Sequence, residues 1–271
     1  MTSRLLGVIK RHPQITFFVL AYAVAWAFVA FGSFGAFGPL VAALVVVPLT
    51  RGWTGLRDLG SRLIRWRLHW FWYLVALGLP LVVHLVTAGL NTAAGAPVPS
   101  VTTGSVTSAL LVFLVRLVNP TDGPLGEEPG WRGYALPALQ SRYSPLTATT
   151  ILAALVAGWH LPLFFLEEGG LQPPVLVGGL VTTIAVTYWY AWLFNHTNGS
   201  VLLVVMAHSI EGSVQAQGWI YMGVWCATAI GLIVCDPTAW RRPADSRVVT
   251  LPEAQHQPAA PVPPFPDSRR G

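Results

Sequence analysis

Residues 174–194 read PVLVGGLVTTIAVTYWYAWLF, a run that contains no charged side chain. At about 1.5 Å per residue, such a run is long enough to cross a bilayer as one α-helix. Seven or eight apolar blocks of this kind follow one another along the chain. We expect them at 14–31, 34–49, 70–90, 106–118, 146–166, 174–194, 200–214 and 218–234. The sequence therefore predicts an all-α fold, a polytopic membrane helical bundle of about eight transmembrane helices.

The overall composition supports a membrane location. Hydrophobic residues make up 54% of the 271 residues and charged residues 10%, whereas a soluble domain carries about 25% charged residues. The net charge of +5 does not indicate nucleic-acid binding, because the basic residues stand in short stretches between apolar blocks. We therefore expect the lipid bilayer as a partner and no nucleic acid. The first block runs longer than the core of a signal peptide, so no cleavable signal is expected.

The distribution of arginine predicts the orientation of the chain. Basic residues precede the first block and follow the second, fourth and eighth, which favours eight spans with both termini in the cytoplasm. The expected location is the inner (plasma) membrane of a bacterium. The segment 54–68 reads as an amphipathic segment or, as we favour, a basic cytoplasmic loop. Residues 1–235 are expected to form one membrane-embedded domain, and the Pro-rich residues 236–271 a disordered cytoplasmic tail.

Ionisable residues inside apolar blocks indicate a functional site, because they are costly to insert into a membrane. The hexapeptide EEPGWR at 127–132 is the first candidate. Arg132 follows Glu128 by four residues, the spacing of an ion pair on one helix face, which leaves Glu127 free to face a cavity as a general base. The alternative interpretation of this segment is a polar interfacial loop that caps the next helix.

Two histidines lie within later apolar blocks. His160 stands in GWHLP at 158–162 and His208 in the apolar run 202–210. Each could simply donate a hydrogen bond to a neighbouring helix. Together with the acid pair, they could also converge on one site that activates a water directly or through a divalent metal.

These motifs resemble those of the CPBP family, the CAAX protease and bacteriocin-processing intramembrane proteases, and in particular the type II CAAX prenyl endopeptidases. EEPGWRG at 127–133 is similar to the first motif of the family, and WHLP at 159–162 to the second. NHTNGS at 195–200, which leads into Ala207 and His208, is similar to the approach to the third. The resemblance covers about residues 38–210, and the motif-bearing part is about 105–215.

The resemblance implies an intramembrane endopeptidase with a cavity open to the cytoplasm and to lipid, acting on a hydrophobic or lipidated peptide. By the same resemblance, Glu127 and His160 would activate the attacking water, and Glu128 and Arg132 would brace the site. His208 would stabilise the oxyanion. Some family members are described as metal-dependent, in which case Glu127, His160 and His208 would hold a divalent metal such as Zn.

Two positions depart from the family pattern. Val156 replaces the usual Phe four residues before the second-motif histidine, which we interpret as a packing change. Gly212 replaces the usual Asn or Asp four residues after His208, and a glycine has no side chain with which to stabilise an oxyanion. Glu211 lies on nearly the same face as His208 and could join a metal site, act as a protonated donor or simply face water. The alternative function is therefore a catalytically silent immunity or scaffold protein; a transporter is less supported, because repeated halves are not apparent.

Overall fold

The structure, a computed structural model, describes residues 2–97, 103–166, 172–213 and 218–241. Within these ranges the regular elements are all helices. They are α1 (Thr2–Arg11), α2 (Pro13–Ala27), η1 (Val29–Phe31), α3 (Gly38–Leu63), α4 (Phe71–Ala93), α5 (Thr103–Val118), α6 (Pro124–Gly130), η2 (Trp131–Ala135), α7 (Leu136–Gln140), α8 (Pro145–His160), α9 (Leu163–Leu166), α10 (Pro173–His196), α11 (Val201–Glu211), α12 (Trp219–Cys235) and α13 (Pro237–Arg241).

The apolar helices make the chain a multi-pass membrane protein, and the all-α prediction is confirmed. In the described part, five segments are long and apolar enough to cross a membrane: Pro13–Phe31, Gly38–Leu63, Phe71–Ala93, Pro145–Leu166 and Pro173–His196. The other three expected spans form shorter apolar helices at Ser105–Val118, Val201–Glu211 and Trp219–Cys235. With 11 residues, α11 extends only about 16 Å and does not cross a bilayer core of about 30 Å by itself.

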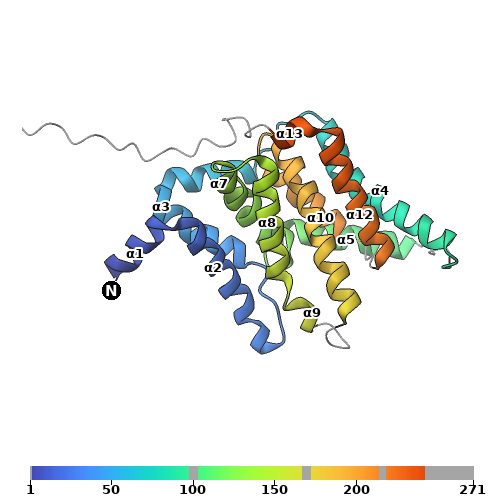
Figure 1. The fold of residues 1–271 in the computed structure, drawn as a ribbon, viewed down its shortest axis with the longest axis horizontal. Helices are drawn as coiled ribbons and strands as arrows, with labels where there is room; N and C mark the ends of the chain where they lie inside the picture. Colours follow the sequence, from blue (N-terminus) through green and yellow to red (C-terminus); the bar gives the residue numbers. More distant parts are fainter. Residues whose placement is uncertain (1, 98–102, 167–171, 214–217, 242–271) are drawn as a thin grey trace, which may run out of the picture.

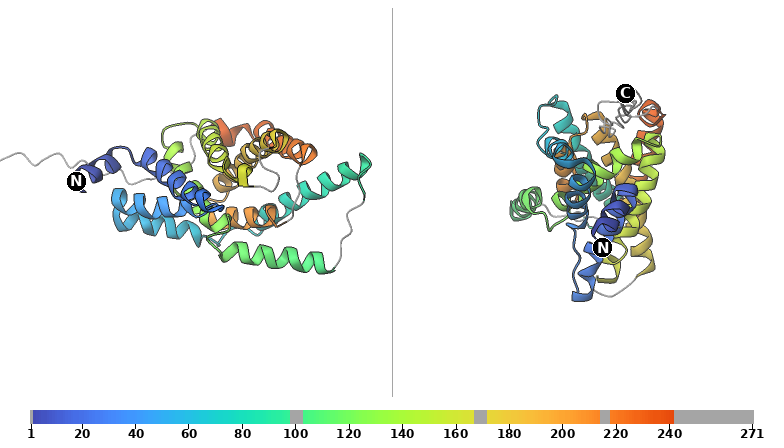
Figure 2. Two further views of the ribbon diagram at one scale, coloured as in Figure 1. Left: turned by 90° about the horizontal axis from the view of Figure 1, so that it is seen from below. Right: turned by 90° about the vertical axis from the view of Figure 1, so that its left-hand side faces the viewer.

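The helices are arranged so that α11 lies inside the bundle. Figure 1 shows α8, α10 and α12 side by side, with α2 and α3 packed together on the N-terminal flank. Seen from below in Figure 2, α11 lies between this row of helices and α5. Because α11 also packs against α4 and α6, its short apolar length is surrounded by protein.

Several helix starts follow directly from the local sequence. Proline occupies the first turn of α2, α3, α6, α8 and α10, where its missing N–H removes no helical hydrogen bond. Ser144 and Ser200 cap α8 and α11, since their hydroxyls accept hydrogen bonds from the N–H groups of Thr147 and Leu203. Ser200 is therefore a helix cap rather than a nucleophile.

Two segments differ from their sequence-based expectations. The loop favoured for 54–68 is wrong for its first part, because α3 bends at Gly52 (φ 64°) and continues as helix to Leu63. The physical reason is that positive φ at a glycine lets the chain turn without ending the helix. At the other end, Pro237–Arg241 of the expected tail form α13, while residues 242–271 lie outside the described residues.

Asp236 joins the ends of α10 and α12 outside the spans. Its Oδ2 accepts a hydrogen bond from Trp192 Nε1 at 3.0 Å and lies 2.9 Å from His196 Nε2. Burial by itself would raise the pKa of Asp236, but hydrogen bonds from Trp192, Thr238 and the Ala239 N–H, together with His196, lower that pKa below its ordinary value. The carboxylate therefore helps to hold these two helix ends together.

Candidate active site

The first motif lies on a buried helical stretch formed by α6, the π-helix η2 and α7. A Cβ atom on Gly126 would lie 2.2 Å from the carbonyl oxygen of Pro120, and one on Gly130 would lie 2.4 Å from that of Pro39. Only glycine permits backbone approach this close. As a result α6 packs tightly against α3 and carries two carboxylates into the protein interior, where Glu127 is 5% exposed and Glu128 is fully buried. π-helical turns of this kind occur often at functional sites.

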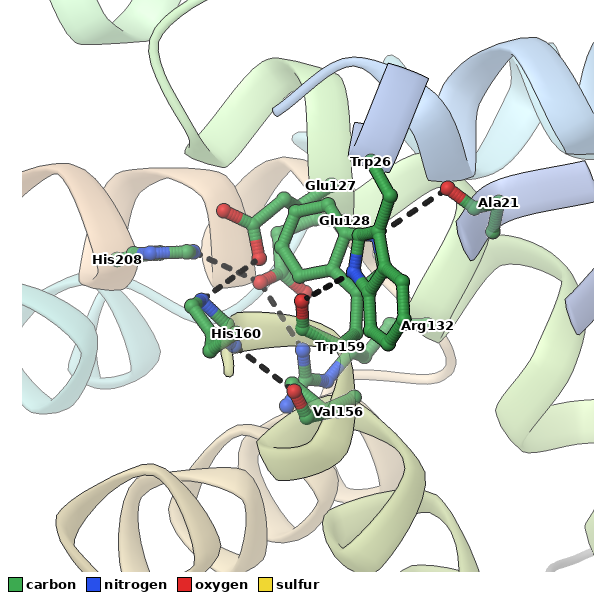
Figure 3. Close-up of polar contacts among 9 residues, drawn as sticks. All are labelled: Ala21, Trp26, Glu127, Glu128, Arg132, Val156, Trp159, His160 and His208. Atoms are coloured by element: carbon green, nitrogen blue, oxygen red, sulfur yellow. Dashed lines mark hydrogen bonds and ion pairs between the residues drawn. The ribbon is translucent and has the colours of Figure 1, made fainter. Parts of the chain in front are cut away.

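Glu128 is the structural member of the acid pair. Its Oε1 accepts a hydrogen bond from Arg132 Nη1 at 3.1 Å, the ion pair that the spacing predicts, and a second from His208 Nδ1 at 2.8 Å (Figure 3). Glu128 and Arg132 are both buried. Because the Nδ1 of His208 is bound to Glu128, its Nε2 is the nitrogen that remains for the site.

His160 and Glu127 face each other across a gap. The Nδ1–H of His160 donates to the carbonyl oxygen of Val156 at 2.8 Å, which leaves a lone pair on Nε2. This Nε2 lies 4.0 Å from Glu127 Oε2 (Figure 3), too far for a direct hydrogen bond. One water about 2.8 Å from each atom can donate to both acceptors. The geometry therefore suits a water held between a carboxylate and an imidazole.

Aromatic residues hold His160 in position. Trp159 Nε1 donates to the carbonyl oxygen of Ala21 at 3.2 Å, and Trp26 Nε1 donates to the carbonyl oxygen of Trp159 at 3.0 Å (Figure 3). These reciprocal bonds join α8 to α2. The ring of Trp159 also packs edge-on against that of His160, with centroids 4.8 Å apart. The end of α8 is thereby fixed where the imidazole faces Glu127.

All the expected site residues that carry ionisable groups meet at one place. A cavity of about 120 Å³ is lined by Glu127, Arg132, Val156, His160, Thr182, Thr183, Val186, Thr187, Tyr190, His208 and Glu211. Glu128 lies directly behind this wall, bound to two of its members. At about 30 Å³ per molecule, the volume is that of a few waters. The three motifs, distant in sequence, thus surround one small polar chamber within an apolar helical bundle.

The order and spacing of these residues match a known family. Residues 105–212, which include both carboxylates and both histidines, match the family model described as Type II CAAX prenyl endopeptidase Rce1-like. This part of the chain is therefore similar to the CAAX proteases. A stretch of 42 residues is 50% identical to CAAX prenyl protease 2 of Methanococcus maripaludis. This stretch covers 16% of the present chain and 16% of that relative.

A second, apolar cavity adjoins the polar chamber. It measures about 340 Å³, and its walls are Phe164, Pro174, Val175, Gly178, Gly179, Thr182, Thr183, Gly218, Trp219 and Tyr221. Thr182 and Thr183 line both cavities. A chain that occupies the apolar cavity would therefore lie directly beside the Glu127–His160 gap.

Glu211 is tied to residues that the sequence did not single out. Its Oε1 accepts a hydrogen bond from the hydroxyl of Tyr221 at 2.6 Å, and its main-chain carbonyl accepts one from His84 Nε2 at 3.1 Å. The rings of His84 and Tyr221 stack at 5.4 Å. His84, to which the sequence assigned no role, thus supports the segment that carries Glu211 into the cavity wall.

The fit of a metal to this site can be tested on the donor atoms. The types of donor suit zinc, since two imidazoles with engaged Nδ1 atoms and a carboxylate border the cavity. Their positions do not, because within the described ranges no three His, Cys, Asp or Glu side chains are close enough to hold one ion. Metal binding by Glu127, His160 and His208 stays a prediction, and the mechanism below uses no metal.

Gly212, the departure from the family pattern, has a steric explanation. Its backbone is ordinary helical (φ −82°, ψ −2°), so the conformation does not demand glycine. A Cβ atom there would instead lie 2.5 Å from Nη2 and 2.7 Å from Cζ of Arg116. The guanidinium of Arg116, held by Asp122 at 3.1 Å, fills the space into which an asparagine side chain would project.

Three residues near the site had no place in the sequence-based prediction: Arg116, Tyr190 and His84. A signal for Tyr190 was present, because Thr183, Thr187 and Tyr190 recur at intervals of four and three on one face of an apolar helix. Arg116 and His84 are ionisable residues inside apolar blocks, which is a signal by itself, but nothing in the sequence shows that their helices pack beside the site. At position 156 it is the main-chain carbonyl that His160 uses, so Val in place of Phe leaves this contact intact.

Proposed function

We propose that this protein is an intramembrane endopeptidase that hydrolyses a peptide bond with a water activated by Glu127 and His160. The observation that carries the proposal is the 4.0 Å gap between Glu127 Oε2 and His160 Nε2 in the wall of a polar cavity. Both groups are hydrogen-bond acceptors there, and a water between them has its protons directed at the two bases and its lone pair free for attack.

The proposed reaction proceeds by general base catalysis. Glu127 takes a proton from the water while the oxygen attacks the peptide carbonyl carbon, and the π electrons move to the carbonyl oxygen. When the tetrahedral intermediate collapses, the carbonyl re-forms and the C–N bond breaks. The proton on Glu127 then passes to the leaving amine. Glu128 takes no part in proton transfer, because Arg132 and His208 already engage its Oε1.

The adjoining cavity supports a hydrophobic or lipidated peptide as substrate. Its walls are largely apolar, and the two threonines that it shares with the polar chamber place an apolar chain next to the scissile bond. The relative from Methanococcus maripaludis is called a CAAX prenyl protease, and the family description reads CAAX prenyl endopeptidase. We propose a membrane-associated peptide whose apolar chain occupies the 340 Å³ cavity.

A catalytically silent immunity or scaffold protein is the second candidate. Gly212 favours it, because the side chain that the family uses at this position is missing. Loss of one oxyanion donor costs about 100- to 1000-fold in rate, which can silence an enzyme in practice.

The test is cleavage by the full-length protein reconstituted in liposomes. Quenched-fluorescent peptides, both plain hydrophobic and lipidated, would be offered to the wild type and to Glu127→Gln and His160→Ala. His69→Ala, which removes an exposed histidine remote from the cavity, is the matched control. We expect cleavage by the wild type and the control and loss in both site variants. Cleavage that survives Glu127→Gln would refute the mechanism, and a wild type that cleaves neither peptide class would favour the silent scaffold.

A further inference from the structure

Tyr190 lines the polar chamber, and its hydroxyl is a buried polar group without a partner in the described part of the chain. Tyr190 belongs to α10 and is 3% exposed, and within the described part of the chain its OH makes no hydrogen bond. Buried hydroxyls are normally hydrogen-bonded, because leaving one unpaired costs free energy. An unpaired hydroxyl on a residue that lines the polar chamber is a candidate for a hydrogen bond to a substrate bound there.

The ring of Tyr190 is fixed by the two residues that bind Glu128. It packs at 5.1 Å against the ring of His208, and the guanidinium carbon of Arg132 lies 5.0 Å from its centroid. A cation over an aromatic face is attracted to it, so Arg132 holds the ring as well as the carboxylate. The ring is thus immobilised from two sides, and its hydroxyl is preorganised, which is what transition-state stabilisation requires.

Neighbouring tyrosines do not share this property. The Tyr221 hydroxyl donates to Glu211 at 2.6 Å, and the Tyr188 hydroxyl, two positions before Tyr190 on the same helix, lies 2.7 Å from Thr150 Oγ1. His208 is also limited as a donor, because its Nδ1 is bound to Glu128 and its Nε2 carries a proton only in the imidazolium form. A neutral phenol, by contrast, always has a proton to donate.

We propose that the Tyr190 hydroxyl donates a hydrogen bond to the oxyanion formed when the activated water attacks the peptide carbonyl. The inference rests on the proposed function and adds one catalytic residue to it. No proton is transferred in this step: the O–H of Tyr190 shortens its contact with the carbonyl oxygen as the π electrons move onto it, and releases it when the C–N bond breaks. Tyr190 thereby supplies the donor that Gly212 cannot.

The experiment compares Tyr190→Phe with Tyr188→Phe in the liposome cleavage assay. Each variant removes one hydroxyl from α10 and keeps the ring, but only the first alters the cavity wall. We expect kcat to fall about 100- to 1000-fold in Tyr190→Phe, the usual loss for one oxyanion donor, with KM within about twofold. Tyr188→Phe should keep the wild-type kcat.

A second measurement separates a catalytic role from a structural one. A phosphinate peptide, which carries a tetrahedral oxyanion, should inhibit Tyr190→Phe more weakly than wild type by a factor similar to the loss in kcat, while the melting temperature stays unchanged. A kcat of Tyr190→Phe within about threefold of wild type would overturn the role of Tyr190, and so would a loss of kcat that follows a lowered melting temperature. The proposed protease function would still stand in either case if Glu127→Gln is inactive. Failure of the wild type to cleave would instead remove the proposed function and this inference with it.

Discussion

Replacing Gly212 by Asn restores the residue that the family pattern expects, yet the structure predicts that this change harms the protein. An added Cβ would lie 2.5 Å from Arg116 Nη2, 2.7 Å from Cζ and 3.1 Å from Nε, all inside van der Waals contact. These atoms are the far end of a flexible side chain, so the guanidinium can move, but it would release Asp122, a half-exposed ion pair worth about 0–1 kcal/mol. The cost therefore stays below that of overpacking in a rigid core, which is about 1–3 kcal/mol. We expect Gly212→Asn to lower the free energy of unfolding by about 0.5–1 kcal/mol and to raise cleavage not at all.

The assay is a thermodynamic cycle read out by thermal unfolding in detergent. Gly212→Asn and Gly212→Ala would each be measured in the wild-type background and together with Arg116→Ala. Since the clash is with Arg116, its removal should recover most of the loss, with a coupling energy of about 0.5 kcal/mol, the low end for residues in contact. The reasoning is refuted if Gly212→Asn melts at or above the wild-type temperature, or if the two changes are simply additive. A gain in cleavage by Gly212→Asn alone would show that the position is a lapsed oxyanion site.

Four further outcomes are expected. Arg132→Ala should lower the free energy of unfolding by about 3–5 kcal/mol, because it removes the guanidinium partner of the buried Glu128 carboxylate. The pKa of Asp236 is lowered in the folded protein, so its contribution to stability is present above about pH 4 and is lost as the pH falls through the lowered pKa. In a plot of melting temperature against pH, Asp236→Asn should therefore reduce the fall in melting temperature at acid pH. Cleavage should survive dialysis against EDTA, with the metal content followed by mass spectrometry. A loss of cleavage that added zinc restores would contradict this prediction and would show that the histidine and glutamate side chains rearrange around an ion. Gly178→Leu should raise KM for a lipidated peptide at unchanged kcat, because the leucine side chain would fill part of the apolar cavity. A Cβ at this position meets nothing within 4 Å, so the change itself is tolerated. Gly231→Leu on α12 is equally unhindered and serves as the control.

The sequence allows the fold class and the members of the site to be predicted because both depend on local pattern. Apolar blocks identify the helices, and the spacing of Glu128 and Arg132 identifies their contact, which depends on helical geometry alone. The location of Glu127, His160 and His208 on one cavity wall needed the resemblance, since nothing in the spacing of three distant motifs fixes how the helices pack.

Where sequence reasoning fell short, the deciding contacts come from other helices. From the sequence alone, Gly212 lacks a hydrogen-bond donor, whereas the structure shows that Arg116 of α5 occupies the space beside it. His84 has no evident role in the sequence, whereas the packing of α4 against α11 brings it to the main chain of Glu211. Helix α11 was expected to span, but it is short and enclosed by α4, α5, α6 and α10. Burial by protein satisfies an apolar helix as well as lipid does, so hydropathy alone cannot separate the two.

Adjacent carboxylates on one buried helix create a division of roles. Successive residues on a helix point about 100° apart, so Glu127 and Glu128 meet different surroundings although both are buried. Glu128 Oε1 accepts hydrogen bonds from Arg132 and His208 at 3.1 and 2.8 Å, whereas the nearest ionisable partner of Glu127 in the described residues, His160, stands 4.0 Å away. The two hydrogen bonds on Oε1 hold the Glu128 carboxylate in one geometry. Glu127 instead faces the cavity, where a water can lie between it and His160. Glu127, not Glu128, is therefore the carboxylate that is positioned to accept a proton from water.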